Sequence, residues 1–191
     1  MTTDEKQARL DAVAEKIVSR QCGLVIAKSC INPVPGDGDP DSKLMFVGEA
    51  PGAQEDKVGR PFVGASGKFL DEMLESIGLR REDVFVTNIV KFRPPENRDP
   101  TPLEVKACLP YLLEQIDIIQ PRIIIFLGRH SMNVFLPELK IGEAHGKVYE
   151  RSDKVFLPLY HPAAALYNGK LRKTLLEDFS KIPTILHTLD N

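Results

Sequence analysis

The stretch that decides the fold is Leu44-Met45-Phe46-Val47-Gly48-Glu49-Ala50-Pro51-Gly52. Its apolar start, Leu44–Val47, predicts a short buried strand, and Glu49 follows soon after that strand. A second segment repeats the arrangement further along the chain, where the apolar run Val155–Leu159 precedes His161. Because an open α/β sheet binds its ligands beyond the carboxyl ends of its strands, the acid and the histidine are candidate active-site residues.

Strand and helix patterns alternate along the rest of the chain. We expect strands at Leu44–Gly48, Val84–Val90, Ile123–Leu127 and Val155–Leu159, and helices at residues 4–20, Ser66–Ile77, Pro102–Ile119, Arg129–Leu136 and Leu171–Phe179. The third of these strands is apolar and rich in β-branched residues, which is typical of a central parallel strand. The alternation predicts an α/β protein with a three-layer, doubly wound fold, in which helices flank a central four-stranded parallel sheet. No repeat or linker divides the sequence, so we expect residues 1–191 to form a single domain.

Composition excludes several classes of protein. The 191 residues are 42% hydrophobic, which is enough for one domain with a substantial core. No apolar stretch reaches the length of a membrane span and no signal region opens the chain, so we expect a cytoplasmic protein that does not bind membranes. We also expect a monomer. The three cysteines, Cys22, Cys30 and Cys108, cannot all pair with one another, and a reducing compartment would keep them free. The formal net charge of −2 gives no general sign of a nucleic-acid binder, which would need a local basic surface.

Four motifs occur in order and cover nearly the whole chain. They read G-E-A-P-G-x-x-E-D from residue 48, G-R-P-F-V-G-x-x-G from residue 59, T-N-x-V-K-x-R-P-P-x-N-R-D-P-T-P from residue 87, and H-P-A from residue 161. Together, over about residues 19–180, the chain resembles the family-4, thermostable class of the uracil-DNA glycosylase superfamily. One motif alone would have little specificity, whereas four in order at similar spacing are specific.

The resemblance implies a monofunctional DNA glycosylase that acts in base excision repair. Such an enzyme hydrolyses the N-glycosidic bond of uracil in single- and double-stranded DNA and leaves an abasic site. Two alternatives remain open: a glycosylase-like protein that binds DNA without cleaving it, and a glycosylase for another deaminated base. A phosphate-binding loop at Gly64–Lys68 is excluded, because Phe62 and Phe69 stand where that motif needs glycine and Ser or Thr.

Glu49 and His161 are the expected catalytic pair. As the glycosidic bond breaks, negative charge builds on uracil, and a donor aimed at uracil O2 would stabilise it. The resemblance gives this role to His161 and implies that Glu49 is catalytic. By analogy with glycoside hydrolysis, a carboxylate at Glu49 would orient water and stabilise the cationic sugar. His130 and His145 lie outside the four motifs and are expected to have structural roles.

Uracil itself is expected to contact Phe62, Asn88, Glu55 and Gly48. The resemblance implies that Phe62 stacks on the flipped base, an interaction worth roughly 1–3 kcal/mol. The Asn88 carboxamide presents a donor and an acceptor side by side, which matches O4 and N3–H of uracil and opposes the pattern of cytosine. Glu55 resembles a family position near uracil C5, where a side chain would exclude the methyl group of thymine.

Residues from three segments are expected to hold the DNA. Basic side chains around the proline-rich loop would bind phosphates. A serine in the first turn of a helix, where N–H groups are exposed, suits another phosphate. One of two adjacent large side chains after the histidine motif would fill the space left by the flipped base, and the sequence leaves open which. The basic side chains are Lys91, Arg93 and Arg98, the serine is Ser66, and the two large side chains are Leu166 and Tyr167.

The chain departs from the family it resembles at the cysteines that hold a 4Fe-4S cluster in typical members. The four corresponding positions are Ser19, Cys22, Phe92 and Cys108, so two ligands are missing. We therefore predict no cofactor and no metal site, with Phe92 filling the vacated space by apolar packing. A cluster on an incomplete cysteine set, with Cys30 as the only other thiol, remains the alternative.

Overall fold

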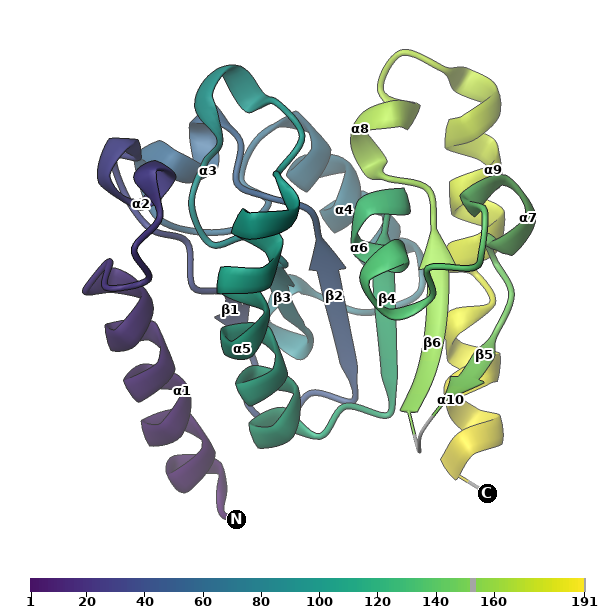
Figure 1. Cartoon of the computed structure of the whole chain (residues 1–191). Helices are drawn as coiled ribbons and strands as arrows, with labels where there is room; N and C mark the ends of the chain where they lie inside the picture. The colour runs from purple at the N-terminus through teal and green to yellow at the C-terminus, as the bar shows by residue number, and fades with distance from the viewer. Residues whose placement is uncertain (152–153, 191) are drawn as a thin grey trace.

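The computed structural model describes residues 1–151 and 154–190 and shows a six-stranded sheet with helices on both faces (Figure 1). The strands are β1 (Asp37–Gly38), β2 (Leu44–Gly48), β3 (Phe85–Asn88), β4 (Ile123–Leu127), β5 (Tyr149–Arg151) and β6 (Lys154–Leu159). Their order in the sheet is β1-β3-β2-β4-β6-β5. The strands β2, β3, β4 and β6 run parallel, whereas β1 and β5 pair antiparallel with β3 and β6 at the two edges.

Long and short helices connect the strands. The longer ones are α1 (Thr3–Val18), α4 (Ala65–Ser76), α5 (Pro102–Ile119), α9 (Gly169–Phe179) and α10 (Ile182–Asp190), and the shorter ones are α2 (Val25–Ser29), α3 (Ala53–Val58), α6 (Arg129–Phe135), α7 (Ile141–Ala144) and α8 (Pro162–Ala165). The 3₁₀ turns η1 (Arg81–Asp83) and η2 (Pro95–Asn97) precede and follow β3. A capping box fixes the start of α5, since Thr101 Oγ1 accepts the N–H of Glu104 (3.3 Å) and the Glu104 carboxylate accepts the N–H of Thr101 (2.7 Å).

Alternate residues of the central strands enter two separate cores, one on each face of the sheet. Met45 and Val47 of β2 pack in the core that contains residues of α1, α5 and α6, whereas Leu44 and Phe46 pack with α4 and α9. The Phe46 ring stacks on Phe179 of α9 with the ring centroids 5.6 Å apart. Burial on both faces of the sheet explains why β2 and β4 are continuously apolar.

The expected three-layer α/β fold is confirmed, and its four parallel strands form the centre of the sheet. The sequence pattern does not predict the edge strands β1 and β5, so the sheet is larger and more mixed than expected. β1 has two half-buried residues in a segment rich in proline and glycine, and β5 has three residues that are half-buried or exposed. Neither strand therefore carries a hydrophobic pattern. Within the described residues, no helix is both long and apolar enough to cross a membrane.

Replacing Phe92 with alanine should strongly destabilise the fold. The Phe92 side chain is fully buried in the core that also contains Cys108. Because its removal leaves a cavity, we expect the free energy of unfolding, measured by urea denaturation, to fall by about 3–5 kcal/mol. Leu103→Ala, at the exposed start of α5, is the control and should stay within about 0.5 kcal/mol of the parent. An equally small change for Phe92→Ala would contradict its packing role.

Candidate active site

The carboxyl ends of the parallel strands border a cavity of about 340 Å³. In the sheet, β2 connects to β3 on one side of it, and β4 connects to β6 on the other side, so the strand order reverses between the neighbouring strands β2 and β4. Open α/β sheets bind ligands at such a reversal point. The cavity brings together most of the residues that the sequence predicts for the site. Those that line it are Glu49, Glu55, Phe62, Ser66, Asn88, Arg98 and His161.

Gly48 leaves room for two side chains of the site. The strands β2 and β3 pair in a register that places Gly48 beside Asn88. A Cβ atom on Gly48 would lie 2.4 Å from Asn88 Oδ1 and 2.7 Å from the Phe62 ring, which is too close for any side chain. Gly48 therefore contributes its small size, and the Asn88 carboxamide and the Phe62 ring lie against it.

Phe62 has a left-handed backbone conformation, with a φ of 52°, that costs free energy unless contacts hold it. The Glu55 carboxylate in α3 accepts the N–H groups of the next two residues, at 2.9 and 2.8 Å. Gly67 of α4 comes so close that a Cβ atom there would lie 1.9 Å from the Phe62 carbonyl oxygen. These contacts fix the aromatic ring, which stacks on His161 with the ring centroids 5.8 Å apart.

His161 presents an N–H donor to the cavity. It caps α8, where its Nδ1 accepts the N–H of Ala163 at 3.1 Å. In the neutral ring the proton therefore lies on Nε2. Burial lowers the pKa of His161 to about 4, so the imidazole is neutral near pH 7. A preorganised neutral donor of this kind can stabilise an anion that develops in the cavity.

Glu49 lies half-buried just beyond β2. Burial raises the pKa of its carboxyl group, and the nearby His130 opposes that rise. A carboxylate in this setting is a stronger base than one in water, which suits a group that accepts a proton. His145 is placed differently, because its Nδ1 lies 2.6 Å from Asp178 Oδ2 of α9, in keeping with the structural role expected for it.

Three residues at or beside the cavity are not singled out by the sequence patterns. Asn97 and Asp99, from the loop after β3, line the cavity. His130, for which a structural role is expected, lies beside the site, with its Nε2 atom 3.9 Å from Glu49 Oε2 and 3.3 Å from Asp99 Oδ2. The sequence signal that could have indicated this location is that His130 follows soon after β4. Three side chains here could each offer one atom to a metal ion, and these atoms lie within 4.8 Å of one another: those of Glu49, Asp99 and His130. Exposed acidic groups are commonly this close without a metal.

Lys91 is fully buried, and the phosphate contact expected of it is therefore wrong. Its Nζ donates to Thr87 Oγ1 (2.7 Å), to the Asn88 carbonyl oxygen (2.8 Å) and to Gln115 Oε1 (2.8 Å). Burial lowers the pKa of the Lys91 ammonium group to about 7. A lysine beside a proline-rich loop is typical of a surface, but here tertiary packing turns the side chain inward. Lys91 thus anchors the backbone of the residue whose carboxamide faces the cavity.

The other DNA contacts expected from the sequence stay predictions. Arg93 has 28% of its side chain exposed. The Arg98 guanidinium group donates two hydrogen bonds, of 2.9 and 2.7 Å, to one carboxylate of α5. Ser66 lies in the first turn of α4, a helix whose N-cap has no side-chain hydrogen bond. Leu166 is half-buried against the core beside α4 and α9, whereas Tyr167 is 96% exposed.

Comparison of the sequence with known proteins finds one family model and several similar proteins. A family model described as the uracil DNA glycosylase superfamily matches residues 35–181. The type-4 uracil-DNA glycosylase of Sulfurisphaera tokodaii is 50% identical over 184 residues, which cover 91% of this chain and 83% of that protein. The type-4 enzyme of Saccharolobus solfataricus is 47% identical over 197 residues, covering 95% and 90%. That of Archaeoglobus fulgidus is 50% identical over 184 residues, covering 91% of each chain.

The His161 imidazole should titrate near pH 4, as followed by NMR of the histidine ring protons and assigned by their loss in His161→Gln. The unfolded chain takes up this proton near pH 6.5, so between pH 6.5 and about 4 the unfolded state binds more protons than the folded state. The free energy of unfolding should therefore fall as the pH is lowered through that range, and it should fall less in His161→Gln. A midpoint near 6.5 would contradict the burial of this ring.

Proposed function

We propose that this chain, which belongs to the uracil-DNA glycosylase superfamily, hydrolyses the N-glycosidic bond of uracil in DNA and leaves an abasic site. The observation that carries the proposal is that one cavity holds Asn88, Phe62, His161 and Glu49. These side chains suit the four tasks of the reaction, which are recognising the base, stacking on it, stabilising the departing anion and delivering water. The type-4 relatives are named for the same activity.

Base recognition would combine stacking with one carboxamide. A uracil flipped out of the DNA stack lies on the Phe62 ring, an interaction worth roughly 1–3 kcal/mol. The Asn88 carboxamide donates to O4 and accepts from N3–H. Cytosine presents the opposite pattern at these two atoms, so an amide held in one orientation rejects it. Gly48 keeps the space between ring and amide free of side-chain atoms.

His161 and Glu49 would divide the work of bond cleavage. The bond between uracil N1 and sugar C1′ breaks, and its electron pair leaves with the uracil ring. Nε2–H of His161 donates to O2, where the negative charge collects. A water oxygen forms the new bond to C1′, and the Glu49 carboxylate accepts the proton that this water loses. The same carboxylate stabilises the positive charge on the sugar before the water adds. A proton from solvent neutralises the released uracil anion.

The protein would act as a monomer on single- and double-stranded DNA held at the rim of the cavity. The N-terminus of α4, with Ser66 in its first turn, offers backbone N–H groups to a phosphate. Arg98 borders the cavity, and its guanidinium group, although paired with Glu104, would contact a phosphate there. Tyr167 suits the space left by the flipped base better than Leu166 does, because its ring is almost wholly exposed.

Gly48→Ala should slow uracil release by about a hundredfold or more without unfolding the protein, because the new Cβ displaces both the Asn88 carboxamide and the Phe62 ring. The measurement is single-turnover release of uracil from a single-stranded oligonucleotide, detected by strand cleavage in alkali. Gly142→Ala is the matched control, since its Cβ would meet nothing closer than the Tyr160 hydroxyl at 3.8 Å. A parental rate for Gly48→Ala would show that the base binds elsewhere.

The parent protein in the same assay decides between the proposed function and its alternatives. Release of uracil supports the glycosylase. Binding of the oligonucleotide without release would favour a DNA-binding protein that has no activity. Release of hypoxanthine or xanthine but not uracil would favour a glycosylase for another deaminated base.

We infer that the chain holds no 4Fe-4S cluster, because the residues at the four family positions do not fit one. Phe92 offers no ligand atom and is buried in the core. Ser19 Oγ donates to the carbonyl oxygen of Lys16 at 2.7 Å. Burial raises the pKa of Cys108 to about 11, so this residue stays a thiol, whereas iron–sulfur clusters bind thiolates. Cys22 is thus the one remaining family position with a half-exposed thiol.

Anaerobic reconstitution with iron and sulfide, followed by iron analysis and visible absorbance, tests this inference. The parent should bind no stoichiometric iron and show no broad visible band. The double variant Ser19→Cys/Phe92→Cys restores four cysteines and should gain both signals. A cluster in the parent would contradict the inference and favour binding through the incomplete cysteine set.

A further inference from the structure

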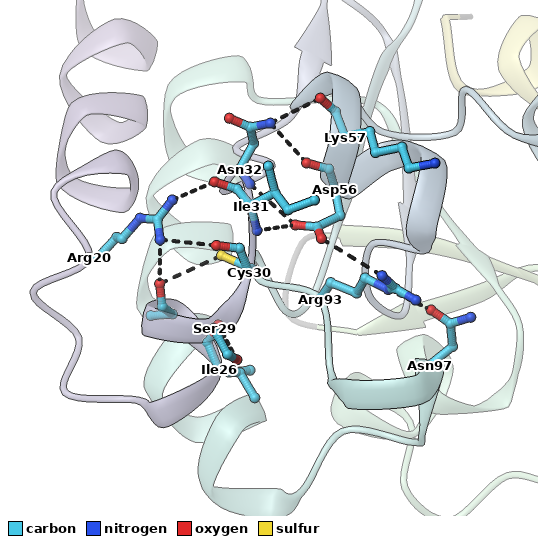
Figure 2. Close-up of polar contacts among 11 residues, drawn as sticks. Arg20, Ile26, Ser29, Cys30, Ile31, Asn32, Asp56, Lys57, Arg93 and Asn97 are labelled. Atoms are coloured by element: carbon cyan, nitrogen blue, oxygen red, sulfur yellow. Dashed lines mark hydrogen bonds and ion pairs between the residues drawn. The ribbon is translucent and has the colours of Figure 1, made fainter.

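A chain of polar contacts joins three segments that lie far apart in the sequence: the loop after α1, helix α3 and the loop after β3 (Figure 2). At its start, Arg20 Nη1 donates to the carbonyl oxygens of Ala27 (3.0 Å) and Cys30 (3.1 Å). Arg20 Nη2 donates to the carbonyl oxygen of Ile31 (2.7 Å). One guanidinium group therefore holds the loop that follows α1 in a fixed shape.

Asp56 connects this loop to α3. Its buried carboxylate accepts the N–H groups of Ile31 (2.9 Å) and Asn32 (3.2 Å). Asn32 Nδ2 in turn donates to the carbonyl oxygens of Asp56 (2.9 Å) and Lys57 (3.0 Å). Because two backbone N–H groups orient the Asp56 carboxylate, its second oxygen has a defined direction, and that oxygen faces Arg93 (Figure 2).

Arg93 lies between Asp56 and Asn97 (Figure 2). Its Nη1 is 3.8 Å from Asp56 Oδ2, and its Nε donates to Asn97 Oδ1 at 2.8 Å. The carboxamide oxygen of Asn97 is thus directed at Arg93, and the carboxamide nitrogen points away from it (Figure 2). Asn97 also lines the cavity. The bond from Arg93 therefore decides which end of the Asn97 amide is available to a ligand.

The backbone around Asn97 needs such support. Glu96 and Asn97 both have a φ of 55°, in the left-handed region, which asparagine tolerates but glutamate rarely adopts. Consecutive residues in this region cost free energy and persist only where the surrounding contacts hold them. Arg98 is tied to Glu104 by two hydrogen bonds on one side of this turn, and Arg93 holds Asn97 itself.

We propose that the Asp56–Arg93 pair is a positioning device that turns the Asn97 carboxamide so that its N–H groups face the cavity. This inference rests on the proposed function. An N–H donor suits a cavity in which Glu49 and the departing base both carry negative charge, whereas a flipped amide would present an oxygen to them. Arg93 thus acts through Asn97 and not as a phosphate contact, the role that its basic character suggests.

The variant Arg93→Lys distinguishes a role in positioning Asn97 from a role in binding a phosphate. Lysine keeps the positive charge but lacks the planar guanidinium that binds Asn97 and Asp56 together. If Arg93 positions Asn97, the single-turnover rate of uracil release at saturating DNA should fall about tenfold or more. The Kd for DNA carrying a non-cleavable uracil analogue, and its dependence on salt, should match the parent. If Arg93 binds a phosphate, Arg93→Lys should keep the parental rate. Arg93→Gln should then reduce the magnitude of the slope of log K for DNA binding against log salt concentration by about one.

A double-mutant cycle tests whether Arg93 acts through Asn97. Asn97→Ala should lower the rate of uracil release, and adding Arg93→Lys should cause no further loss, because the group that Arg93 orients is already gone. Losses that multiply in the double variant would overturn the proposal. Arg151→Lys, which changes an exposed arginine paired with Glu138, is the matched control and should release uracil at the parental rate.

Failure of this inference differs from failure of the proposed function. If the parent releases uracil and the Arg93→Lys variant releases it at the same rate, the positioning role alone is overturned. A parent that releases no uracil overturns both. Circular dichroism and a urea melt of Arg93→Lys confirm that a lower rate reflects the site and not unfolding.

Discussion

Parallel pairing of β2 with β3 is the constraint on which the site depends. Gly48 pairs with Asn88, and backbone hydrogen bonds from residues 89–90 to the carbonyl oxygens of Gly48 and Glu49 continue the pairing beyond the strands. The acid after one strand and the amide at the end of the other are thereby held at the same edge of the sheet. The buried ammonium group of Lys91 secures the same point from inside the protein, since it binds the Asn88 carbonyl oxygen. The aromatic ring, the histidine and the proline-rich loop are arranged around this edge.

Three carboxylates close together in the sequence lie in different environments, which their hydrogen bonds distinguish. Glu55 borders the cavity, but one of its oxygens accepts two backbone N–H groups and so supports the loop that carries Phe62. Asp56 is bound by two backbone N–H groups and faces Arg93. Among the described residues, the Glu49 carboxylate accepts no hydrogen bond, and burial raises its pKa. Of the three, it is therefore the carboxylate that we propose binds a water molecule and a developing cation.

The sequence predicts those parts of the fold and site that depend on local patterns. Apolar runs identify β2, β4, β6 and the first half of β3. The side chains assigned to the chemistry share one cavity because parallel strands end at the same edge. It does not predict the burial of Lys91 or the place of His130 beside Glu49, because packing alone decides which way a side chain turns beyond a strand. The edge strands are likewise defined by pairing with a neighbour and not by their own hydrophobicity.

A crystal structure of the protein with free uracil tests most directly whether this cavity is the base-binding site. We expect the uracil ring to stack on Phe62, with O4 and N3–H within about 3.2 Å of the Asn88 carboxamide and O2 at a similar distance from His161 Nε2. Uracil bound outside the cavity, or bound inside it with the O4 and N3–H edge turned away from Asn88, would contradict the assignment.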